Sequence, residues 1–409
     1  MTRADYNAAV VGAGPAGLTA AVALAASGMR IAIAGPAFAP DPNRPDTRTT
    51  ALLQASVQLL KNIGVWESCQ ENAAPLDLIR IIDDTGRLMR APEVAFDSKE
   101  VGGGPFGYNI PNTALVAALY ACANALPNLD VIETQAATEI DPMSDAVSVT
   151  LAEGQVFSAQ LIAGADGRKS LCREAAGLTT SSWSYPQVAI ACNFEHNDPH
   201  HNASNEFHRP AGPFTTVPLP GNASSLVWVE TAAEADRLLA LSDAEFCAEI
   251  EERSYCCLGA VNSVGPRATF PLSGMRVQSY AARRIALVGE AAHVIPPIGA
   301  QGLNLGFRDA AALVECAQRG TDNHGDPGCD EALREYNGAR RADVVSRTLA
   351  VDLLNRSLIS GFLPLQVARG VGLHLLAGMA PLRRMVMREG VAPQAGLPEL
   401  MQHPTSNHA

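Results

Sequence analysis

The sequence predicts an α/β fold in which a nucleotide-binding type of domain is interrupted by a mixed or antiparallel β-sheet domain and followed by a C-terminal helical region. Three observations lead to this prediction. A strand–helix–strand pattern opens the chain, short strand-like runs with Pro and Gly turns dominate residues 188–270, and a buried-strand pattern at 285–288 precedes a helix-rich stretch. Strand and helix patterns of the nucleotide-binding type therefore lie on both sides of a β-rich central segment, as expected when a second domain is inserted into the first.

The composition limits the classes of protein to be considered. The chain has 409 residues, of which 47% are hydrophobic and 18% charged, as in globular proteins with more than one domain. A net charge of -12 argues against nucleic acid as a partner. The nine cysteines show neither C-x-x-C nor a zinc-ligand spacing, so we expect reduced thiols and a cytoplasmic location. No apolar run reaches the ~18 residues that a membrane-spanning helix needs.

Apolar periodicity and turn residues predict the individual elements in chain order. The opening unit is a strand at 6–11, a helix at 14–28 and a strand at 31–34. A helix at 51–63, a hairpin at 79–89, and a helix at 113–125 capped by Asn112 or Thr113 come next. Short strands at 136–162 and 188–270 and a buried strand at 285–288 complete the predicted sheets, and helices follow residue 304.

The hexapeptide GAGPAG places Gly12, Gly14 and Gly17 in G-x-G-x-x-G spacing, with Pro15 between the last two glycines. It follows a predicted strand and opens a predicted helix, which is the context that a Rossmann-like dinucleotide site requires. The glycines permit a tight turn, a close approach of the pyrophosphate to the backbone, and close packing of helix on sheet. The N-terminus of the helix then faces the phosphates.

One part of such a site is absent. The second strand of a Rossmann unit ends in an acid that binds the adenosine ribose, but Gly35 stands at this position. In one interpretation Asp41 or Asp46 substitutes for it. In the other, Arg44 and Arg48 accommodate the 2′-phosphate of NADP. The first motif alone leaves both interpretations open.

Two later motifs place acids at the ends of buried strands. Asp166 follows one strand, where an Asp-Gly pair by itself is equally typical of an ordinary turn, and Glu290 follows the strand at 285–288. Gly299 and Gly302 then bracket a helix start, whose free N–H groups favour electron-rich atoms. A second carboxylate-plus-helix site far along the chain indicates a ligand with a polyol beyond its pyrophosphate. FAD has this shape.

The three motifs GAGPAG, GADGRKS and GEAAHVIPPIGAQGLNLG occur in the order found in the FAD-dependent aromatic hydroxylases, which include para-hydroxybenzoate hydroxylase, and the chain resembles this group. RTTALLQASVQLLKNIGVWE and GAQGLNLGFRDA narrow the resemblance to the ubiquinone-biosynthesis hydroxylases, over residues 6–390. Two departures are Gly35, in place of the usual acid, and Glu290, where many members have Asp.

The resemblance implies bound FAD. The glycine-rich loop would contact the pyrophosphate, Arg48 would lie near the adenosine half, and Glu290 would serve the ribitol–pyrophosphate region. Asp166 would bear on both FAD and the reducing nicotinamide, and residues 299–304 would contact the flavin edge. The implied cofactor-binding residues are Gly12, Gly14, Pro15, Gly17, Arg48, Asp166, Glu290, Gly299, Gln301, Gly302, Leu303 and Asn304.

The resemblance also implies a monooxygenase that uses NAD(P)H, as a transient reductant, and O₂ to hydroxylate the ring of a polyprenylated phenol in ubiquinone biosynthesis. The cofactor carries this chemistry, so no side-chain triad is expected. His293 and the backbone of Pro297 are weak catalytic candidates near the flavin, and a structural histidine is the competing interpretation of His293. A flavin-dependent prenyl-lipid reductase and a non-catalytic flavoprotein component of a biosynthetic complex are the alternative functions.

The expected domain division follows from the order of the motifs. FAD-binding parts occupy 1–75, 112–178 and 276–330, substrate-domain strands occupy 76–111 and 179–275, and the C-terminal helical region with a short disordered tail occupies 331–409.

Two segments have unusual composition. The run 195–208 holds His196, His200, His201 and His208, but its Asn, Pro and Ser favour a solvated loop over a metal site, so we expect no metal. Residues 356–388 carry five arginines and no acid, beside Leu358, Phe362 and Leu365. This second segment is either a helical packing tail or an interfacial surface that meets the inner face of a membrane. Other ubiquinone-biosynthesis proteins are further expected partners.

Overall fold

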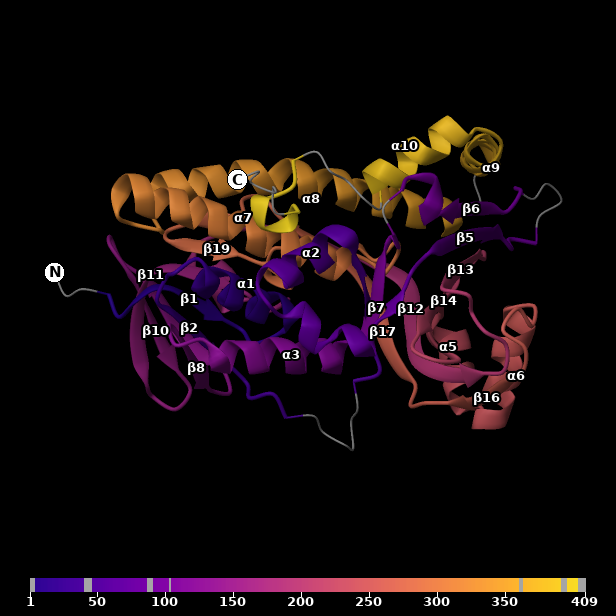
Figure 1. The fold of residues 1–409 in the computed structure, drawn as a ribbon, viewed down its shortest axis with the longest axis horizontal. Coiled ribbons are helices and arrows are strands. Elements are labelled where there is room, and N and C mark those ends of the chain that lie inside the picture. The colour runs from indigo at the N-terminus through magenta and orange to yellow at the C-terminus, as the bar shows by residue number, and fades with distance from the viewer. Residues whose placement is uncertain are drawn as a thin grey trace, which may run out of the picture.

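The computed structural model describes residues 4–39, 46–86, 91–102, 104–359, 363–390 and 396–403. Two large sheets lie beside each other along the long axis of the molecule, and two long C-terminal helices run across them (Figure 1). The predicted α/β class is confirmed. Asp41, Arg44, Met89 and Phe362 lie outside the described residues, as do the side chains of Leu358 and Leu365.

The first sheet has eight strands and is built around β1 (Tyr6–Val11), which pairs in parallel with β2 (Ile31–Gly35) and β11 (Val156–Gly164). The next strands outward are β8 (Leu129–Glu133), parallel to β2, and β19 (Ile285–Leu287), parallel to β11. The remaining strands are antiparallel: β9 (Ala137–Pro142), β10 (Val147–Leu151) and β18 (Ala281–Ala282). Strands separated by more than a hundred residues therefore lie side by side at the centre of the sheet.

The helices α1 (Pro15–Ala26), α3 (Asn112–Ala125) and α7 (Gln301–His324) belong to this half of the molecule, and α1 packs against both others. The short helix α4 (Leu171–Ala175) follows β11. The β1 and α1 residues Val10, Leu18 and Leu24 are fully buried in the common core. Long apolar runs buried on both faces are typical of parallel strands, which explains the near-continuous apolar sequence of β1 and β2.

The second sheet has nine strands, of which β12 (Thr180–His196) is the longest and pairs with β15 (Ala223–Thr231), β16 (Val261–Val264) and β17 (Ala268–Val277). The other five strands are β14 (Pro213–Leu219), β13 (Ala203–His208), β5 (Leu78–Asp83), β6 (Val94–Asp97) and β20 (His293–Val294). Two helices that the periodicity did not predict, α5 (Ala232–Ala240) and α6 (Asp243–Arg253), bury Leu238 and Phe246 beside Trp228.

A small third sheet of β3 (Thr49–Leu53), β7 (Gly107–Pro111) and β4 (Ala74–Pro75) joins the two halves. The Nδ2 of Asn109 on β7 donates to the carbonyl of Pro218 at 2.9 Å, and Thr49 Oγ1 donates to Ser225 Oγ at 2.9 Å. These long-range hydrogen bonds fix β3 and β7 against the second sheet.

Three local predictions need correction. The helix predicted at 51–63 is a strand up to Leu53 and becomes helical, as α2, only over Gln54–Asn62, because residues 49–53 pair with β7. The α3 helix has Pro111 at its N-cap and no side-chain cap, since Asn112 Oδ1 instead accepts a hydrogen bond from Thr50. In the hairpin predicted at 79–89, the strand that pairs with β5 is β6, at 94–97.

The expected domain division stays a prediction. It can be compared with the residues that supply strands to each sheet. The first sheet takes strands from 6–35, 129–164 and 281–287, and the second takes strands from 78–97, 180–277 and 293–294. Strand β7, expected in the substrate domain, belongs to the small third sheet.

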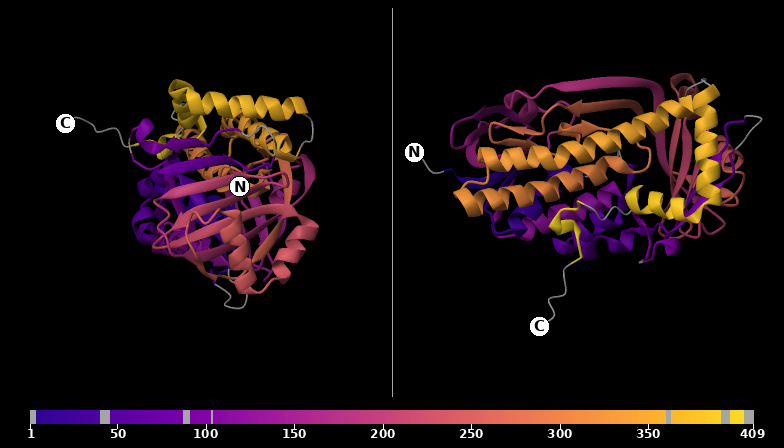
Figure 2. Two further views of the ribbon diagram at one scale, coloured as in Figure 1. Left: turned by 90° about the vertical axis from the view of Figure 1, so that its right-hand side faces the viewer. Right: turned by 90° about the horizontal axis from the view of Figure 1, so that it is seen from above.

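Four helices form the C-terminal region: α7, α8 (Asp330–Ile359), α9 (Leu363–Gly378) and α10 (Ala380–Gly390). Seen from above, α7 and α8 lie side by side, α9 turns sharply at the far end of α8, and α10 runs back toward the middle of the molecule (Figure 2). Among the described residues, none of the helices combines the length and the apolar character that crossing a bilayer requires.

Candidate functional site

The GAGPAG loop connects β1 to α1 and leaves a polar backbone surface open. Gly12 has a φ of 113°, and a Cβ at this position would lie 2.3 Å from the carbonyl oxygen of Ala165. A Cβ at Gly17 would lie 2.0 Å from the carbonyl oxygen of Gly12, so both positions require glycine for close packing. Gly14 is the N-cap of α1, and a Cβ there would meet nothing within 4 Å. The space beside Gly14 is where a pyrophosphate approaches the helix N-terminus.

The carboxylate of Glu290 lies in the short 3-10 turn after β19, at the C-terminal end of the parallel strands. Arg168 donates to it twice, from Nε at 3.3 Å and from Nη2 at 3.1 Å, and both side chains are about half exposed. The motif at 166–173 and the motif at 287–306 are therefore joined through this ion pair. A carboxylate at this edge of the sheet is accessible to a polyol.

Arg48 lies on the Glu290 side of the site. It donates from Nε and Nη2 to Asp46, each at 2.7 Å, and its guanidinium carbon lies 5.5 Å from the ring centroid of Phe270. The hydrogen bonds that Arg48 donates to Asp46 and, more weakly, the charge of Glu290 raise the pKa of Arg48. The placement of Arg48 near the adenosine half of FAD stays a prediction.

Asp166 has a local structural role in the protein. Its Oδ1 accepts from Ser170 Oγ at 2.5 Å and its Oδ2 accepts from the backbone N of Cys172 at 3.0 Å, which caps the start of α4. The carboxylate is partly exposed and shapes the turn that carries Arg168.

The start of α7 presents exposed backbone. Pro297, Gly299 and Gly302 are exposed, and a Cβ at either glycine would meet nothing within 4 Å. Gly306, one turn further on, packs closely, because its Cβ would lie 3.2 Å from that of Ala16 on α1. Ala300, the N-cap of α7, has a left-handed φ of 54°, which is uncommon for a residue with a side chain. Such local strain is characteristic of functional loops.

Asn304 holds this loop in place, although sequence reasoning placed it among the cofactor ligands. Its Oδ1 accepts from the backbone N of Leu53 at 2.9 Å and from Ser56 Oγ at 2.7 Å. Its Nδ2 donates to the carbonyl oxygens of Ala51, at 2.8 Å, and Ala300, at 2.5 Å. The amide is buried and all four bonds are internal, so Asn304 positions the α7 start against β3 and α2. Leu303 is half-buried beside it.

His293 is enclosed and is a structural residue. Its side chain is 1% exposed, and Nε2 lies 2.7 Å from Oδ2 of Asp309, which is fully buried. A carboxylate only accepts hydrogen bonds, so Nε2 carries the proton and is not free to act as a base. These contacts favour the structural interpretation of His293, and its catalytic role stays an untested prediction.

Asp309 is the centre of a charged network that the sequence motifs did not reveal. The backbone N of Gly289 donates to its Oδ2 at 2.9 Å, and Arg340 Nε donates to its Oδ1 at 2.6 Å. Arg340 continues to Asp343, which also accepts from Arg308 and Arg347. Arg347 reaches Gln301 at the start of α7, with 3.0 Å between Nη1 and Oε1. The network thus links both ends of the 287–306 motif to α8.

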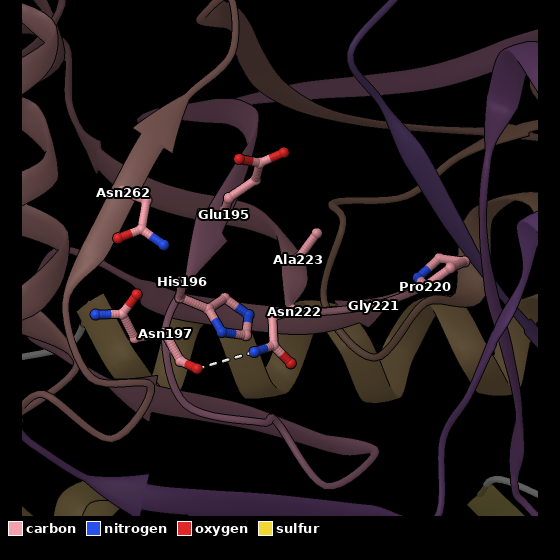
Figure 3. A pocket seen from close by; sticks show the side chains of 8 residues that line it. All are labelled: Glu195, His196, Asn197, Pro220, Gly221, Asn222, Ala223 and Asn262. Carbon is pink, nitrogen blue, oxygen red and sulfur yellow. Dashed lines mark hydrogen bonds between the residues drawn. The ribbon is translucent and has the colours of Figure 1, made fainter.

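The candidate histidine run, which spans the end of β12 and all of β13 in the second sheet, carries a pocket of its own. His196 Nδ1 lies 2.8 Å from the carbonyl oxygen of Asp198, and Nε2 lies 3.0 Å from Ser224 Oγ. His200 and His208 bond Leu219 and Glu206. Figure 3 shows the open, polar pocket of about 470 Å³ near His196, lined by Glu195, His196, Asn197, Pro220, Gly221, Asn222, Ala223 and Asn262.

The geometry of the main site fits FAD. Gly14 leaves open space at an uncapped helix N-terminus, Glu290 offers a carboxylate, and Gly299 and Gly302 offer exposed backbone at a second helix start. All three features lie at the C-terminal edge of the first sheet, where α/β folds bind their ligands. The fold and site define a FAD-dependent monooxygenase.

Comparisons with known proteins establish the family. Residues 5–343 match the FAD binding domain family. The chain is 35% identical over 387 residues to the ubiquinone hydroxylase UbiL of Rhodospirillum rubrum, covering 93% of this chain and 88% of that protein. It is 30% identical to the 3-demethoxyubiquinol 3-hydroxylase of Escherichia coli, covering 95% of this chain and 99% of that protein. The chain belongs to the ubiquinone-biosynthesis FAD-dependent hydroxylase family, as its motifs indicated, and its cofactor is FAD.

The fold comparison agrees. The crystal structure of p-nitrophenol 4-monooxygenase PnpA from Pseudomonas putida superposes with a TM-score of 0.75 at 20% identity, covering 94% of this chain and 98% of that chain. The structure of HpxO from Klebsiella pneumoniae, complexed with FAD and uric acid, superposes with a TM-score of 0.71 at 18% identity, covering 96% and 97%. At this identity the likeness shows the shared fold.

Proposed function

We propose that this protein uses NAD(P)H and O₂ to hydroxylate the aromatic ring of a polyprenylated phenol in ubiquinone biosynthesis. The observation that carries the proposal is the exposed backbone at Pro297, Gly299 and Gly302, held against the third sheet by Asn304. This surface suits the edge of a flavin ring. The printed names of the relatives, ubiquinone hydroxylase and 3-demethoxyubiquinol 3-hydroxylase, support the choice of substrate class.

Each part of the chain has a defined task in this reaction. Bound FAD, once reduced, supplies the activation of O₂ and the transfer of one oxygen atom to an electron-rich ring. The glycine-rich loop and the α1 N-terminus bind the pyrophosphate, with Glu290 beside the ribitol. Asn304 and the strained turn at Ala300 fix the flavin-facing backbone, and the second sheet supplies a wall that orients the ring and excludes water.

The function is tested with the purified protein, NAD(P)H and a short-chain prenylated phenol under ¹⁸O₂. We expect one ¹⁸O atom in the hydroxylated ring. Consumption of reductant with a saturated product and no need for O₂ would identify the reductase instead. A bound flavin that NAD(P)H never reduces, in a protein that purifies with others, would identify the non-catalytic component. In a deletion strain, the accumulated quinone precursor names the missing step.

We further propose that the C-terminal helices meet a membrane surface. Of the large hydrophobic residues that are exposed in the described part of the chain, most gather between residues 345 and 386. We call this set the C-terminal apolar surface, and it consists of Val345, Leu349, Leu353, Val371, Leu375, Met379, Met385 and Val386. Spacing of four residues aligns Val345, Leu349 and Leu353 on α8 and Val371 and Leu375 on α9, so each helix shows one apolar stripe. Met379 follows directly after the end of α9.

The opposite sides of these helices are packed. Leu373 of α9 and Met387 of α10 are buried with Phe96 and Phe106, which docks the helices on β6. The exposed cations Arg384 and Arg388 lie on α10 beside the apolar surface. Apolar area flanked by arginine is the composition of an interfacial surface at anionic lipid. A substrate with a polyprenyl tail is dissolved in such a membrane.

Arg383 has a different role from the one its position in the arginine run indicated. It forms an ion pair with Glu100, with Nη2 2.8 Å from Oε2, and its Nη1 donates to the carbonyls of Leu376 and Ala377 at the end of α9. The guanidinium of Arg383 is therefore paired within the protein, where it holds α10 to the end of α9 and to Glu100. Arg356 pairs similarly with Asp352 of its own helix.

Replacing apolar residues is thus the sharper test of membrane binding. The variant with Leu349→Ser, Leu353→Ser, Leu375→Ser and Met379→Ser should retain FAD but lose flotation with anionic liposomes. The matched control replaces Met143 and Val156, which are exposed hydrophobics outside the C-terminal apolar surface, and should float as the wild type does. Flotation of the four-residue variant with liposomes would overturn the proposal, as would a wild type that never floats. In that case the C-terminal apolar surface would be assigned to binding another protein.

A further inference from the structure

The end of β2 lacks a carboxylate because there is no room for a side chain. A Cβ at Gly35 would lie 2.6 Å from the backbone N of Ala13 and 2.8 Å from its Cβ. Ala13 belongs to the glycine-rich loop, so any side chain at Gly35 would displace the backbone that the pyrophosphate approaches. In a Rossmann unit the acid at this strand end binds the hydroxyls of the adenosine ribose. In this protein that carboxylate has to come from another element.

Glu133 is the closest candidate in the strand register. It is the last residue of β8, and it is the parallel-strand partner of Gly35. The backbone N of Thr134 donates to the carbonyl oxygen of Gly35 at 3.0 Å, which holds the two strand ends together. Neighbouring strands are only about 4.8 Å apart, and paired residues of parallel strands project from the same face. Glu133 therefore projects from the face where the Gly35 side chain is missing.

The surroundings orient Glu133 and leave part of it open. The hydroxyl of Tyr120 on α3 donates to Glu133 Oε1 at 2.6 Å, and this hydrogen bond is the main reason that the pKa of Tyr120 is raised. Tyr120 consequently stays a donor at neutral pH. Glu133 is exposed, and within the described part of the chain Oε2 has no hydrogen-bond partner. That oxygen is available to a ligand.

An aromatic pair lies beside this carboxylate. Phe38, three residues after β2, has its ring centroid 6.2 Å from that of Tyr120, at an interplanar angle of 40°. Both side chains are half-buried, so their faces are partly accessible. Aromatic faces of this kind accommodate a purine ring.

We propose that Glu133 binds the adenosine ribose of FAD in place of an acid at Gly35, oriented by Tyr120, with Phe38 and Tyr120 flanking the adenine. The adenosine half then lies across the ends of β2 and β8, while the pyrophosphate lies at Gly14. A carboxylate at this place repels a 2′-phosphate, so the same geometry opposes an NADP site at the end of β2. The inference rests on FAD binding and not on the identity of the phenol.

The test separates the adenosine half of FAD from the flavin half. Apoprotein is titrated with FAD and with FMN, which lacks adenosine, and flavin fluorescence reports binding. Glu133→Ala should weaken FAD binding about ten- to hundredfold, the effect of losing a hydrogen bond to a charged group, with FMN affinity and apoprotein melting temperature unchanged. Tyr120→Phe should weaken FAD binding less. Glu139→Ala, which removes another exposed carboxylate on β9, the next strand in the chain, is the matched control and should change neither affinity.

Unchanged FAD affinity in Glu133→Ala would overturn the proposal, as would equal weakening of FAD and FMN. Both readouts are binding constants. A protein that binds FAD through Glu133 but fails to hydroxylate a prenylated phenol would therefore contradict only the proposed function, and the converse result would contradict only this inference.

Discussion

The imidazole of His293 and the carboxylate of Asp309 form a buried pair, with 2.7 Å between Nε2 and Oδ2. The same carboxylate accepts from the backbone N of Gly289 and from Arg340. One side chain on α7 therefore fixes the turn that carries Glu290 and anchors it to α8. The position of Glu290 therefore depends on side chains that are buried behind the turn.

Asp309→Asn should destabilise the protein by about 3–5 kcal/mol, because it leaves Arg340 and His293 buried without their shared counter-charge. Urea unfolding of the FAD-free protein measures the change in free energy. Glu174→Gln, on the surface helix α4, is a control expected to change it by less than about 0.5 kcal/mol. If Asp309→Asn lowers the free energy of unfolding by as little as the control does, the charged network does not support the fold.

The pair of His293 and Asp309 also predicts how the stability of the fold changes with pH. Burial alone would raise the pKa of Asp309, but the charges of His293 and Arg340 hold it below its ordinary value of 3.8. A carboxyl whose folded-state pKa is depressed stabilises the fold above its unfolded pKa, and that contribution is lost as the pH falls through the folded value. Melting temperature should therefore fall below about pH 4 in the wild type, and less steeply in Asp309→Asn. Parallel curves would contradict this assignment.

Gly14→Val should abolish FAD retention while leaving the apoprotein folded, because the space beside Gly14 is empty of protein atoms. Gly17→Ala is the contrasting variant: its Cβ would lie 2.0 Å from the carbonyl oxygen of Gly12, so it should lower the apoprotein melting temperature as well. Flavin absorbance of the purified proteins and calorimetry of the apoproteins distinguish the two effects. A yellow Gly14→Val protein would refute the pyrophosphate assignment.

Glu290→Ala should weaken FAD binding about ten- to hundredfold, the cost of a lost hydrogen bond to a charged group. The apoprotein should keep its melting temperature, because an ion pair as exposed as that with Arg168 contributes little to stability. Fluorescence titration of the apoprotein measures the affinity. If FAD affinity is unchanged and the melting temperature falls, Glu290 serves the turn and not the ligand.

Asn304→Ala should lower both stability and FAD affinity. The substitution leaves the buried backbone N of Leu53 and the hydroxyl of Ser56 without their acceptor, at about 1–3 kcal/mol for each unsatisfied group. It also releases the α7 start at Ala300, so the flavin-facing backbone loses its fixed shape. Chemical unfolding and flavin fluorescence anisotropy report the two effects. A variant with wild-type stability would show that these hydrogen bonds are replaced by water.

Sequence patterns predicted the parts of this fold that depend on local chemistry. The βαβ unit at 6–35 followed from glycine spacing and apolar runs, and β1 begins and ends as predicted. The positions of Gly14, Glu290 and Gly299 at one edge of the sheet also followed from their places at strand and helix ends.

Strand pairing and side-chain contacts between residues distant in sequence could not be predicted from local patterns. Residues 49–53 have helical periodicity and yet form β3, because β7 offers them hydrogen bonds. The roles of Asn304 and Glu133 depend on neighbours that are distant in sequence, namely Leu53 and Gly35. The arginine run at 356–388 left a packing tail and an interfacial surface as alternatives, and it gave no indication that Arg383 pairs with Glu100, 283 positions upstream.

The order of strands in the first sheet has a consequence for biosynthesis. β11 lies between β1, at the start of the chain, and β19, near its last third. While the ribosome has yet to release Ile285 and the residues after it, the nascent chain has the glycine-rich loop but neither Glu290 nor the α7 start. Capture of flavin therefore follows synthesis of at least the first 302 residues of the 409. A ligand that binds only the folded state stabilises it, so the cellular supply of FAD should set how much newly made protein escapes degradation.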